Sequence, residues 1–326
     1  MILKVFLEDE IRNVIKVDTR AIEEIEKGFT AYSDGKVQVP PILRLDFPNV
    51  QGEIDVKTAV IEDLDSFALK VSSGFFDNHK LNLPSLSGLM MLFSSQTGML
   101  KTIFLDNGYL TDVRTGIAGA IAAKYLAKQQ ISSVGVIGTG VQARYQVEAL
   151  SLVRDFDTVH VFGRNENAAK KYAEDISTAL GKQVIVHQDI ESVVKNSDIV
   201  ITTTPATAPL IKSEWLHPGI HITAVGSDAE HKQELEPEVF SKADLVACDI
   251  MEQCIRLGEL HHAKENLIDF DLQNVVELGD IISGKTAGRV SDEQITVCDL
   301  TGTGIQDTAI ARLAFKLLEN SKEKVK

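Results

Sequence analysis

Residues 133–143 read SVGVIGTGVQA and combine an apolar run, a glycine-rich turn and the start of a helix. Gly138, Gly140 and Ala143 occupy the small positions of the dinucleotide-binding fingerprint. The first position makes the tight turn, the second lets a pyrophosphate approach the backbone, and the third lets helix and strand pack. The amino terminus of the helix then faces the phosphates. Because glycine-rich turns also occur by chance, the flanking sequence has to decide the fold.

Strand-like apolar runs follow this turn at intervals and are separated by helical stretches such as 167–180. The runs are 158–162, 183–187, 198–204, 221–226, 244–248 and 294–298. Strands that alternate with helices are typical of an α/β protein. We therefore predict a Rossmann domain, a doubly wound parallel sheet, over residues 130–301.

The rest of the chain has a different pattern. A helix is expected at 19–32, and strand-like runs at 53–61, 67–73, 88–95 and 101–106 indicate an antiparallel sheet. A last helix, 306–318, follows the Rossmann strands and is expected to return to this region. We predict a discontinuous α+β domain, 1–129 with 302–326, and catalysis in the cleft between the two domains.

Composition narrows the class of protein. The 326 residues carry 33 basic and 47 acidic side chains, a net charge of −14, which argues against nonspecific binding to nucleic acid or an anionic membrane. The start of the chain has no signal-peptide pattern, and no apolar run is long enough for a membrane helix. Cys248, Cys254 and Cys298 have no metal-ligand spacing. No further ligand spacing supports a metal site at His261–His262, which we interpret as a cofactor-edge or structural feature. We expect a cytoplasmic protein with reduced thiols and no metal site.

The end of the second Rossmann strand bears on the cofactor. An NAD-preferring fold usually has Asp or Glu there, whereas this chain has Gly163, Arg164 and Asn165. Because an arginine can pair with a 2′-phosphate, we predict that NADP(H) is preferred and that NAD(H) is the alternative. In that alternative Arg164 only caps a loop, and the site accepts both cofactors. The predicted cofactor-binding residues are Gly138, Thr139, Gly140, Val141, Gln142, Arg164, Asn165, Thr203, Gly226 and Asp228.

Three cations stand out in the first domain: Arg44 in PPILRLDF, Lys70 in FALKVSS and Arg114 in LTDVRTG. A lysine on an apolar strand either reaches solvent or has an anionic partner. Each cation alone is compatible with a surface position. Together, in an acidic protein with a nucleotide fold, they indicate a clamp for a substrate carboxylate.

Arg114 comes just before a run of small residues, 116–123. These residues let another backbone pack closely and leave no room for a guanidinium, so Arg114 is expected to point away from the packed face. We expect Thr111 or Asp112 to cap the helix, which places Arg114 in its first turn.

Asp228, in AVGSD, follows a Rossmann strand at the edge where ligands bind in open α/β sheets. Its alternative role is to cap the following helix. Glu53, Asp55 and Lys57 alternate along one strand and share a face. They either line the side-chain end of the substrate pocket or face solvent.

Four blocks carry a resemblance to a known family. LTDVRTGIAGAIAAKYLA, VGVIGTGVQA, AVGSDAEHKQEL and DLTGTGIQDTAIA resemble, in this order, the ornithine cyclodeaminase/mu-crystallin family over nearly the whole chain. Within the family, four stretches are most similar to cyclodeaminase-like proteins encoded with ectoine-utilisation genes: KVSSGFFDNHKLNLPSLSGLM, DNGYLTDVRT, GSDAEHK and RLGELHHA.

The resemblance implies a homodimer built through the first domain, which then serves substrate binding and dimerisation. It also implies NAD(P)(H) in the Rossmann domain and a small amino or imino acid as substrate. Arg44, Lys70 and Arg114 match the positions that bind the substrate carboxylate in the family, and Asp228 matches the catalytic aspartate. Asp228 and Lys70 are the predicted catalytic residues.

Three functions are compatible with this pattern. The first is an NAD(P)-dependent oxidoreductase at the α carbon of a small amino or imino acid, of the imine reductase or amino-acid dehydrogenase type. The second is a redox-neutral ornithine cyclodeaminase with bound NAD, which forms proline and ammonia. The third is a non-catalytic, crystallin-like protein that binds NADPH and small ligands. The cation set and Asp228 argue against the third, and Arg164 with Asn165 favours an exchangeable cofactor and so the first.

Overall fold

The computed structural model describes residues 3–323 and divides the chain into two compact units. The first unit runs to Arg114 and resumes at Thr303, and the second covers Thr115–Gly302. The division lies inside helix α3 (Tyr109–Leu126), earlier than the boundary expected after residue 129. Residues 1–2 and 324–326 of the expected first domain lie outside the described residues.

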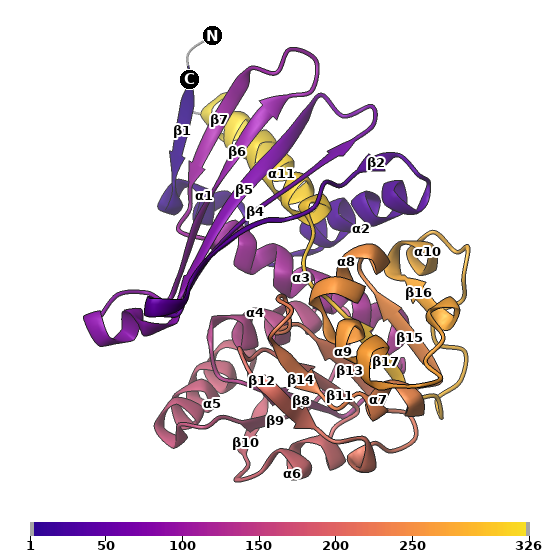
Figure 1. Cartoon of the computed structure of the whole chain (residues 1–326). Helices are drawn as coiled ribbons and strands as arrows, with labels where there is room; N and C mark the ends of the chain where they lie inside the picture. Colours follow the sequence, from indigo (N-terminus) through magenta and orange to yellow (C-terminus); the bar gives the residue numbers. More distant parts are fainter. Residues whose placement is uncertain (1–2, 324–326) are drawn as a thin grey trace. The chain divides into compact units, whose positions relative to one another are not determined.

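The second unit contains an eight-stranded parallel sheet with the order β10-β9-β8-β11-β13-β17-β15-β16 (Figure 1). Its strands are β8 (Ser133–Ile137), β9 (Thr158–Phe162), β10 (Gln183–Val186), β11 (Ile199–Thr202), β13 (His221–Ala224), β15 (Leu245–Cys248), β16 (Val275–Glu277) and β17 (Thr296–Asp299). Its helices after α3 are α4 (Val141–Leu150), α5 (Glu166–Leu180), α6 (Ile190–Lys195), α7 (Glu238–Lys242), α8 (Met251–Leu257), α9 (Glu259–Asn266) and α10 (Leu278–Ile282). The predicted doubly wound parallel sheet is confirmed.

The sheet is parallel because both of its faces are buried. Ile199 and Ile201 of β11 belong to one apolar cluster, whereas Val200 between them belongs to another. Since successive side chains of a strand point to opposite faces, the two clusters lie on the two faces of the sheet. Strands buried on both faces have continuous apolar runs, which is why the sequence revealed them.

A small two-stranded sheet also belongs to the second unit and was not expected from the sequence. Its strands are β12 (Thr207–Ile211) and β14 (Gln233–Leu235), which pair in parallel. β14 is only three residues long and carries Glu234, a buried carboxylate. No sequence pattern distinguishes so short a strand from a loop.

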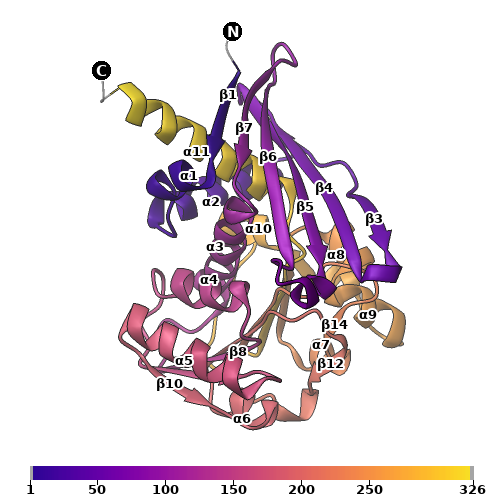
Figure 2. The same cartoon turned by 90° about the vertical axis from the view of Figure 1, so that its left-hand side faces the viewer.

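The first unit contains a second sheet with the order β1-β7-β6-β5-β4-β2, in which β3 also pairs with β4. Its strands are β1 (Lys4–Leu7), β2 (Val37–Gln38), β3 (Leu43–Phe47), β4 (Gly52–Ile61), β5 (Ser66–Phe75), β6 (Leu86–Ser94) and β7 (Leu100–Leu105). The pairing is antiparallel, as predicted, except for β1 and β7, which are parallel. The helices are α1 (Glu8–Val14), α2 (Thr19–Ser33) and α11 (Gly304–Glu323), and α2 and α11 lie side by side along the sheet (Figures 1 and 2).

Helix α11 packs directly on β4 and β5. The Thr308 hydroxyl donates a hydrogen bond to the carbonyl of Ala59 (2.8 Å) and accepts one from the amide of Ala68 (3.0 Å). A Cβ at Gly304 would lie 2.1 Å from the carbonyl carbon of Thr58, so only glycine fits there. This close approach fixes the position of the first turn of α11, which carries Asp307.

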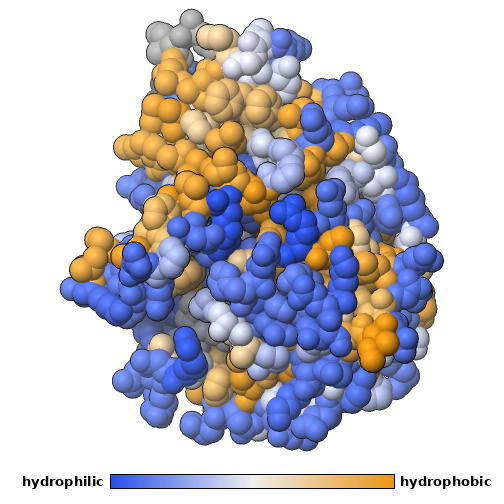
Figure 3. Space-filling model, in the orientation of Figure 1, coloured by the Kyte–Doolittle hydropathy of each residue, from blue (hydrophilic) through white to orange (hydrophobic). Residues whose placement is uncertain are grey.

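The opposite face of this sheet is apolar and partly exposed. Leu69, Met91, Ile103 and Val5 are register partners across β5, β6, β7 and β1, and none of them is buried. Phe67 and Phe93 stack beside this row with ring centroids 5.7 Å apart. We call this surface the open sheet face, and Figure 3 shows apolar residues gathered over this unit.

Helix α3 begins earlier than the sequence indicated. The Asp106 carboxylate accepts a hydrogen bond from the amide of Leu110 (2.7 Å), so neither Thr111 nor Asp112 caps the helix and Arg114 lies in its second turn. The close packing predicted for the small residues is confirmed, because a Cβ at Gly116 would lie 2.7 Å from the carbonyl oxygen of Tyr145 on α4.

Across residues 3–323, every helix is too short or too polar to cross a lipid bilayer.

Candidate functional site

The turn between β8 and α4 has the form that a dinucleotide requires. Gly138 has a φ of +116°, and a Cβ there would lie 2.5 Å from the Thr203 hydroxyl. A Cβ at Gly140 would meet nothing within 4 Å, so the backbone is open there. Gly140 precedes α4 without a side-chain cap, which leaves the first amides of the helix for a phosphate. These features fit a pyrophosphate beside Thr139, Val141 and Gln142.

The carboxyl end of β9 supplies the next part of this edge. Gly163 lies against Thr139, since a Cβ at Gly163 would be 2.6 Å from the Thr139 methyl carbon. The Asn165 side chain accepts a hydrogen bond from the amide of Ala168 (3.0 Å) and so caps α5. Arg164 is exposed, and within the described residues no ion pair or hydrogen bond engages its side chain. A guanidinium in this position is available to an anionic ligand.

Asp228 lies in the loop after β13, two residues beyond Gly226. The next helix, α7, begins only at Glu238 behind Pro237, so the alternative of a helix cap for Asp228 is wrong. Its carboxylate instead pairs with Lys232 Nζ at 2.6 Å. The side chain of Lys232 is only 6% exposed and that of Asp228 is 34% exposed, so a buried ammonium holds a carboxylate that reaches solvent.

In the first unit, two of the predicted cations meet at one carboxylate that the sequence analysis did not single out. Asp307 Oδ2 lies 3.3 Å from Lys70 Nζ, and Asp307 Oδ1 lies 3.0 Å from Arg114 Nε. Arg114 also donates a hydrogen bond to the side-chain oxygen of Gln306 (2.9 Å). The three charged side chains are at most 5% exposed. Arg114 is therefore a buried arginine, not a solvated surface one.

The charges at this point do not balance, because one carboxylate faces two cations. Burial, and after it the positive charge of Arg114, lower the pKa of Lys70 to about 7, even though Asp307 opposes both effects. Lys57 is the register partner of Lys70 on β4 and adds positive charge on the same buried face. An additional anion is therefore favoured beside Lys70 and Arg114.

Arg44 has different partners. It lies opposite Asp55 in the β3–β4 register, 3.4 Å from that carboxylate, and it also pairs with Glu53 and Asp46. Glu53, Asp55 and Lys57 are all buried, which excludes the alternative that this row faces solvent. The three predicted cations therefore form two groups: Arg44 lies with the carboxylates of β3 and β4, and Lys70 of β5 and Arg114 of α3 share Asp307.

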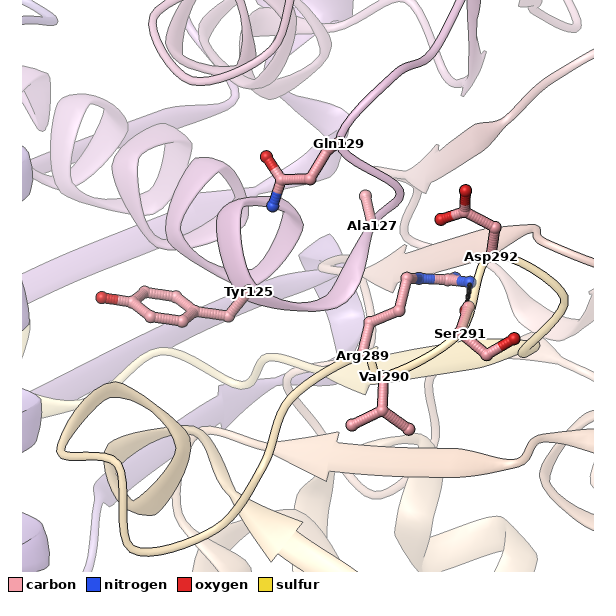
Figure 4. A pocket seen from close by; sticks show the side chains of 7 residues that line it. All are labelled: Tyr125, Ala127, Gln129, Arg289, Val290, Ser291 and Asp292. Atoms are coloured by element: carbon pink, nitrogen blue, oxygen red, sulfur yellow. Dashed lines mark hydrogen bonds between the residues drawn. The ribbon is translucent and has the colours of Figure 1, made fainter.

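One hollow of the second unit lies away from this edge. It measures about 380 Å³ and lies beside Tyr125 and Arg289 (Figure 4). Arg289 donates hydrogen bonds to the carbonyls of Leu126 (2.6 Å), Gln294 (2.6 Å) and Ile220 (3.1 Å). Ile220 and Gln294 precede β13 and β17, so this hollow lies at the amino ends of the strands and Arg289 holds the backbone there.

The three cysteines are free and buried in the second unit. Burial raises the pKa of the Cys254 and Cys298 thiols well above the usual value. Neutral buried thiols of this kind are not nucleophiles, so they contribute to packing rather than to the site.

Comparison with known proteins agrees with this geometry. The profile of the ornithine cyclodeaminase/mu-crystallin family matches residues 3–322. An uncharacterized cyclodeaminase of Sinorhizobium fredii is 47% identical over 319 residues, which cover 97% of this chain and 96% of that protein.

Two solved structures are similar over almost their whole length. An archaeal alanine dehydrogenase dimer with bound NAD has a TM-score of 0.91 and 34% identity, with 98% of this chain and 97% of that chain covered. The Δ1-pyrroline-2-carboxylate reductase of Thermococcus litoralis, in complex with NADH and L-proline, has a TM-score of 0.93 and 29% identity, with 98% of each chain covered. These likenesses support a nicotinamide cofactor for the glycine-rich edge.

Proposed function

Since the chain belongs to the ornithine cyclodeaminase/mu-crystallin family, we propose that it is an NAD(P)-dependent oxidoreductase acting at the α carbon of a small amino or imino acid. Its similar proteins include an alanine dehydrogenase and an imine reductase. The observation that carries the proposal is the excess of buried positive charge where Lys70 and Arg114 share Asp307. A small α-imino acid supplies the carboxylate that this charge favours.

The residues divide the work as follows. Lys70 and Arg114 bind the substrate carboxylate and orient the α carbon. Arg44 contributes a further cation to the substrate-binding residues, and its acidic partners lie beside it on β3 and β4. The guanidinium of Arg114 offers a fork of donors that matches a carboxylate. When bound, the nicotinamide supplies or accepts the hydride. The carboxylate of Asp228 favours the positive charge on the substrate's iminium nitrogen and exchanges the accompanying proton.

The preference for NADP(H) is part of this proposal. It is supported by the exposed Arg164 and by the absence of an acidic residue among Gly163, Arg164 and Asn165 at the end of β9. NAD(H) is the alternative, and it is the form bound in the two similar structures.

We also propose that the protein is a homodimer and that it is cytoplasmic. The open sheet face offers an apolar surface of the kind that an obligate interface buries. A second copy is the occupant we assign to it, because the similar alanine dehydrogenase is a dimer. The cytoplasmic location is supported by three free cysteines, which a reducing compartment preserves.

The deciding experiment measures NADPH and NADH oxidation with a panel of imines. The panel contains keto acids with ammonia or methylamine, cyclic imines and iminosuccinate, with ornithine and NAD⁺ tested alongside. A reductase consumes the reduced cofactor in proportion to the amino acid formed. Release of proline and ammonia from ornithine without net cofactor change would instead identify the redox-neutral cyclodeaminase. If neither reaction occurs but NADPH binds, the non-catalytic function is correct.

A further inference from the structure

Glu234 of β14 is a fully buried carboxylate that the proposed reaction does not use. It accepts hydrogen bonds from the Thr202 hydroxyl (2.6 Å), from the Thr204 amide (2.6 Å) and hydroxyl (2.8 Å), and from the Gly226 amide (2.8 Å). Thr202 ends β11, and Gly226 follows β13 by two residues. One side chain therefore ties together two neighbouring strand ends at the carboxyl edge of the Rossmann sheet.

The chemistry of this contact requires a carboxylate. The amides of Thr204 and Gly226 can only donate, so both oxygens of Glu234 must accept. In a glutamine of the same shape, the NH₂ group would face one of these amide donors, and no hydrogen bond could form there. The space is also full, since a Cβ at Gly226 would lie 2.1 Å from the Thr204 carbonyl oxygen and 2.6 Å from the Glu234 carboxylate.

Glu234 closes the base of the loop that carries Asp228. The bond from the Gly226 amide joins the beginning of the loop to β14, the strand that follows it. Inside the loop, the Ser227 hydroxyl donates to the carbonyl of Lys232 (2.6 Å), and Lys232 Nζ pairs with Asp228. The position of the Asp228 carboxylate thus depends on Glu234 through a short series of hydrogen bonds.

One further buried carboxylate binds the backbone of Glu234, and a second binds the amide of the residue that follows the first. Glu259 accepts hydrogen bonds from the amides of Glu234 (2.6 Å) and Leu235 (3.0 Å), and Asp299 accepts one from the amide of Leu260 (2.9 Å). All three carboxylates are at most 1% exposed. Burying several acids close together is costly, so this arrangement is better explained by the accurate placement of backbone than by stability.

We propose that Glu234 is a positioning residue for hydride transfer: its carboxylate fixes Gly226 and the Asp228 loop against the ends of β11 and β13, where the nicotinamide cofactor binds. This inference rests on the proposed function. Glu234 does not touch the substrate in this assignment. Its loss affects the cofactor and the Asp228 carboxylate, whereas the binding of the substrate carboxylate by Lys70 and Arg114 is unaffected.

The test compares Glu234→Gln with Glu236→Gln as the matched control. Glu236 lies on the same segment, but it accepts a hydrogen bond from the Ser213 amide (2.8 Å), which follows β12 and not β11 or β13. Because a small displacement of reacting groups costs about 10²-fold in rate, E234Q should lower kcat by about that factor and weaken NAD(P)H binding, with little change in KM for the imine. E236Q should change the melting temperature but leave kcat and KM per folded molecule unchanged.

A second pair of variants covers the case in which E234Q does not fold. Thr204→Val removes the hydroxyl that donates to Glu234, and Thr204→Ser keeps it. T204V should lose kcat and cofactor affinity in the same direction as E234Q, and T204S should restore both.

The inference is overturned if E234Q and T204V keep the wild-type kcat and NAD(P)H dissociation constant. It is also overturned if E236Q lowers kcat and NAD(P)H affinity as much as E234Q does. If the wild-type protein reduces no imine of the panel, the proposed function fails separately. The NAD(P)H dissociation constants of the four variants, measured by fluorescence titration, still decide whether Glu234 positions this edge.

Discussion

Lys70 and Arg114 bind opposite oxygens of the same carboxylate, that of Asp307, at 3.3 and 3.0 Å. The three residues come from β5, α3 and α11, so the contact joins the sheet of the first unit to its last helix. Asp307 orients both cations while neutralising only one of them. This arrangement keeps a lysine and an arginine buried yet leaves them attractive to a further anion, and two predictions test it.

Replacing Arg114 by Lys keeps the charge but removes the fork of donors that pairs with a carboxylate. We expect kcat/KM for the imine to fall by about tenfold or more, the loss of one charge-assisted hydrogen bond. The dissociation constant of NAD(P)H should not change, because Arg114 belongs to the other unit. Steady-state kinetics and fluorescence titration on one preparation check both points. Wild-type kcat and KM in this variant would show that Arg114 stabilises the folded structure and does not bind the substrate.

The pKa of Lys70, lowered by burial to about 7, predicts a pH dependence of ligand binding. A carboxylate ligand favours the charged ammonium, so binding should weaken as the pH rises through 7 and Lys70 loses its proton. The measurement is the dissociation constant of pyruvate from the NAD⁺-loaded enzyme between about pH 6 and 9. Lys70→Arg is the control, since arginine stays charged throughout this range and the slope should disappear.

The same pKa has a consequence for stability, with the opposite sign. An unfolded Lys70 keeps its proton up to the usual pKa of 10.5, whereas the folded protein releases it near 7. Between these values the unfolded state binds more protons, so the contribution of Lys70 to the free energy of unfolding rises with pH. Lys70→Met should remove that contribution.

Arg164 is predicted to select the cofactor. Its side chain is exposed at the end of β9, and Arg164→Ala should weaken NADPH binding by about 1.5–3 kcal/mol, the value of a hydrogen bond to a charged group, while NADH binding changes little. Arg12, which pairs with Glu8 at 2.7 Å on α1 of the first unit, offers a control arginine that does not belong to the glycine-rich turn. Tighter binding of NADH than of NADPH by the wild-type enzyme would show that the NADP(H) preference is wrong.

The open sheet face is predicted to be the dimer interface. Met91 lies in the middle of its cross-strand apolar row, and Met91→Asp places a charge where the second copy would pack. We expect the wild-type protein to have the mass of two chains and M91D that of one, measured by light scattering during gel filtration. Val290→Asp, at a side chain 74% exposed in the second unit, should remain dimeric. A monomeric wild type contradicts the assignment.

The parallel sheet could be predicted from the sequence because its strands are buried on both faces and therefore have continuous apolar runs. DIVITTT is such a run, and it indicates a buried strand. The sequence also indicated Lys70 and Arg114 as candidate substrate-binding residues and Asp228 as a candidate catalytic residue. It did not reveal Asp307, since an aspartate in the first turns of a helix is ordinarily a favourable surface charge. Only the packing of α11 on β4 and β5 brings Asp307 to Lys70, which is 237 positions away (307 − 70).

Glu234 was missed for a related reason. It is one of four glutamates in a loop-like stretch, AEHKQELEPE, of which Glu230 and Glu238 are exposed. Its burial depends on β12 and β14, strands too short to be recognised from a pattern. The alternative that Asp228 caps the following helix is wrong for a reason in the same segment, because that helix begins ten residues later, at Glu238.

Asp228 is predicted to act in catalysis and not in binding of the substrate carboxylate. The variant Asp228→Asn tests this role. Asparagine keeps the size and some hydrogen bonding of the side chain but removes its charge and basicity. We expect kcat to fall by about 10² or more, the contribution of a general acid/base group, while pyruvate still binds through Lys70 and Arg114. Both kcat and the thermal midpoint should be measured on the same preparation.

The ion pair with Lys232 makes a second variant necessary, because Asp228→Asn also leaves a buried ammonium without its carboxylate. Lys232→Met breaks the same pair but keeps the Asp228 carboxylate. If the pair only stabilises the loop, both variants should lower the thermal midpoint and neither should lower kcat per folded molecule. If Asp228 acts on the substrate, only D228N should lose most of its turnover, and D228N that is destabilised yet fully active would remove Asp228 from the catalytic assignment.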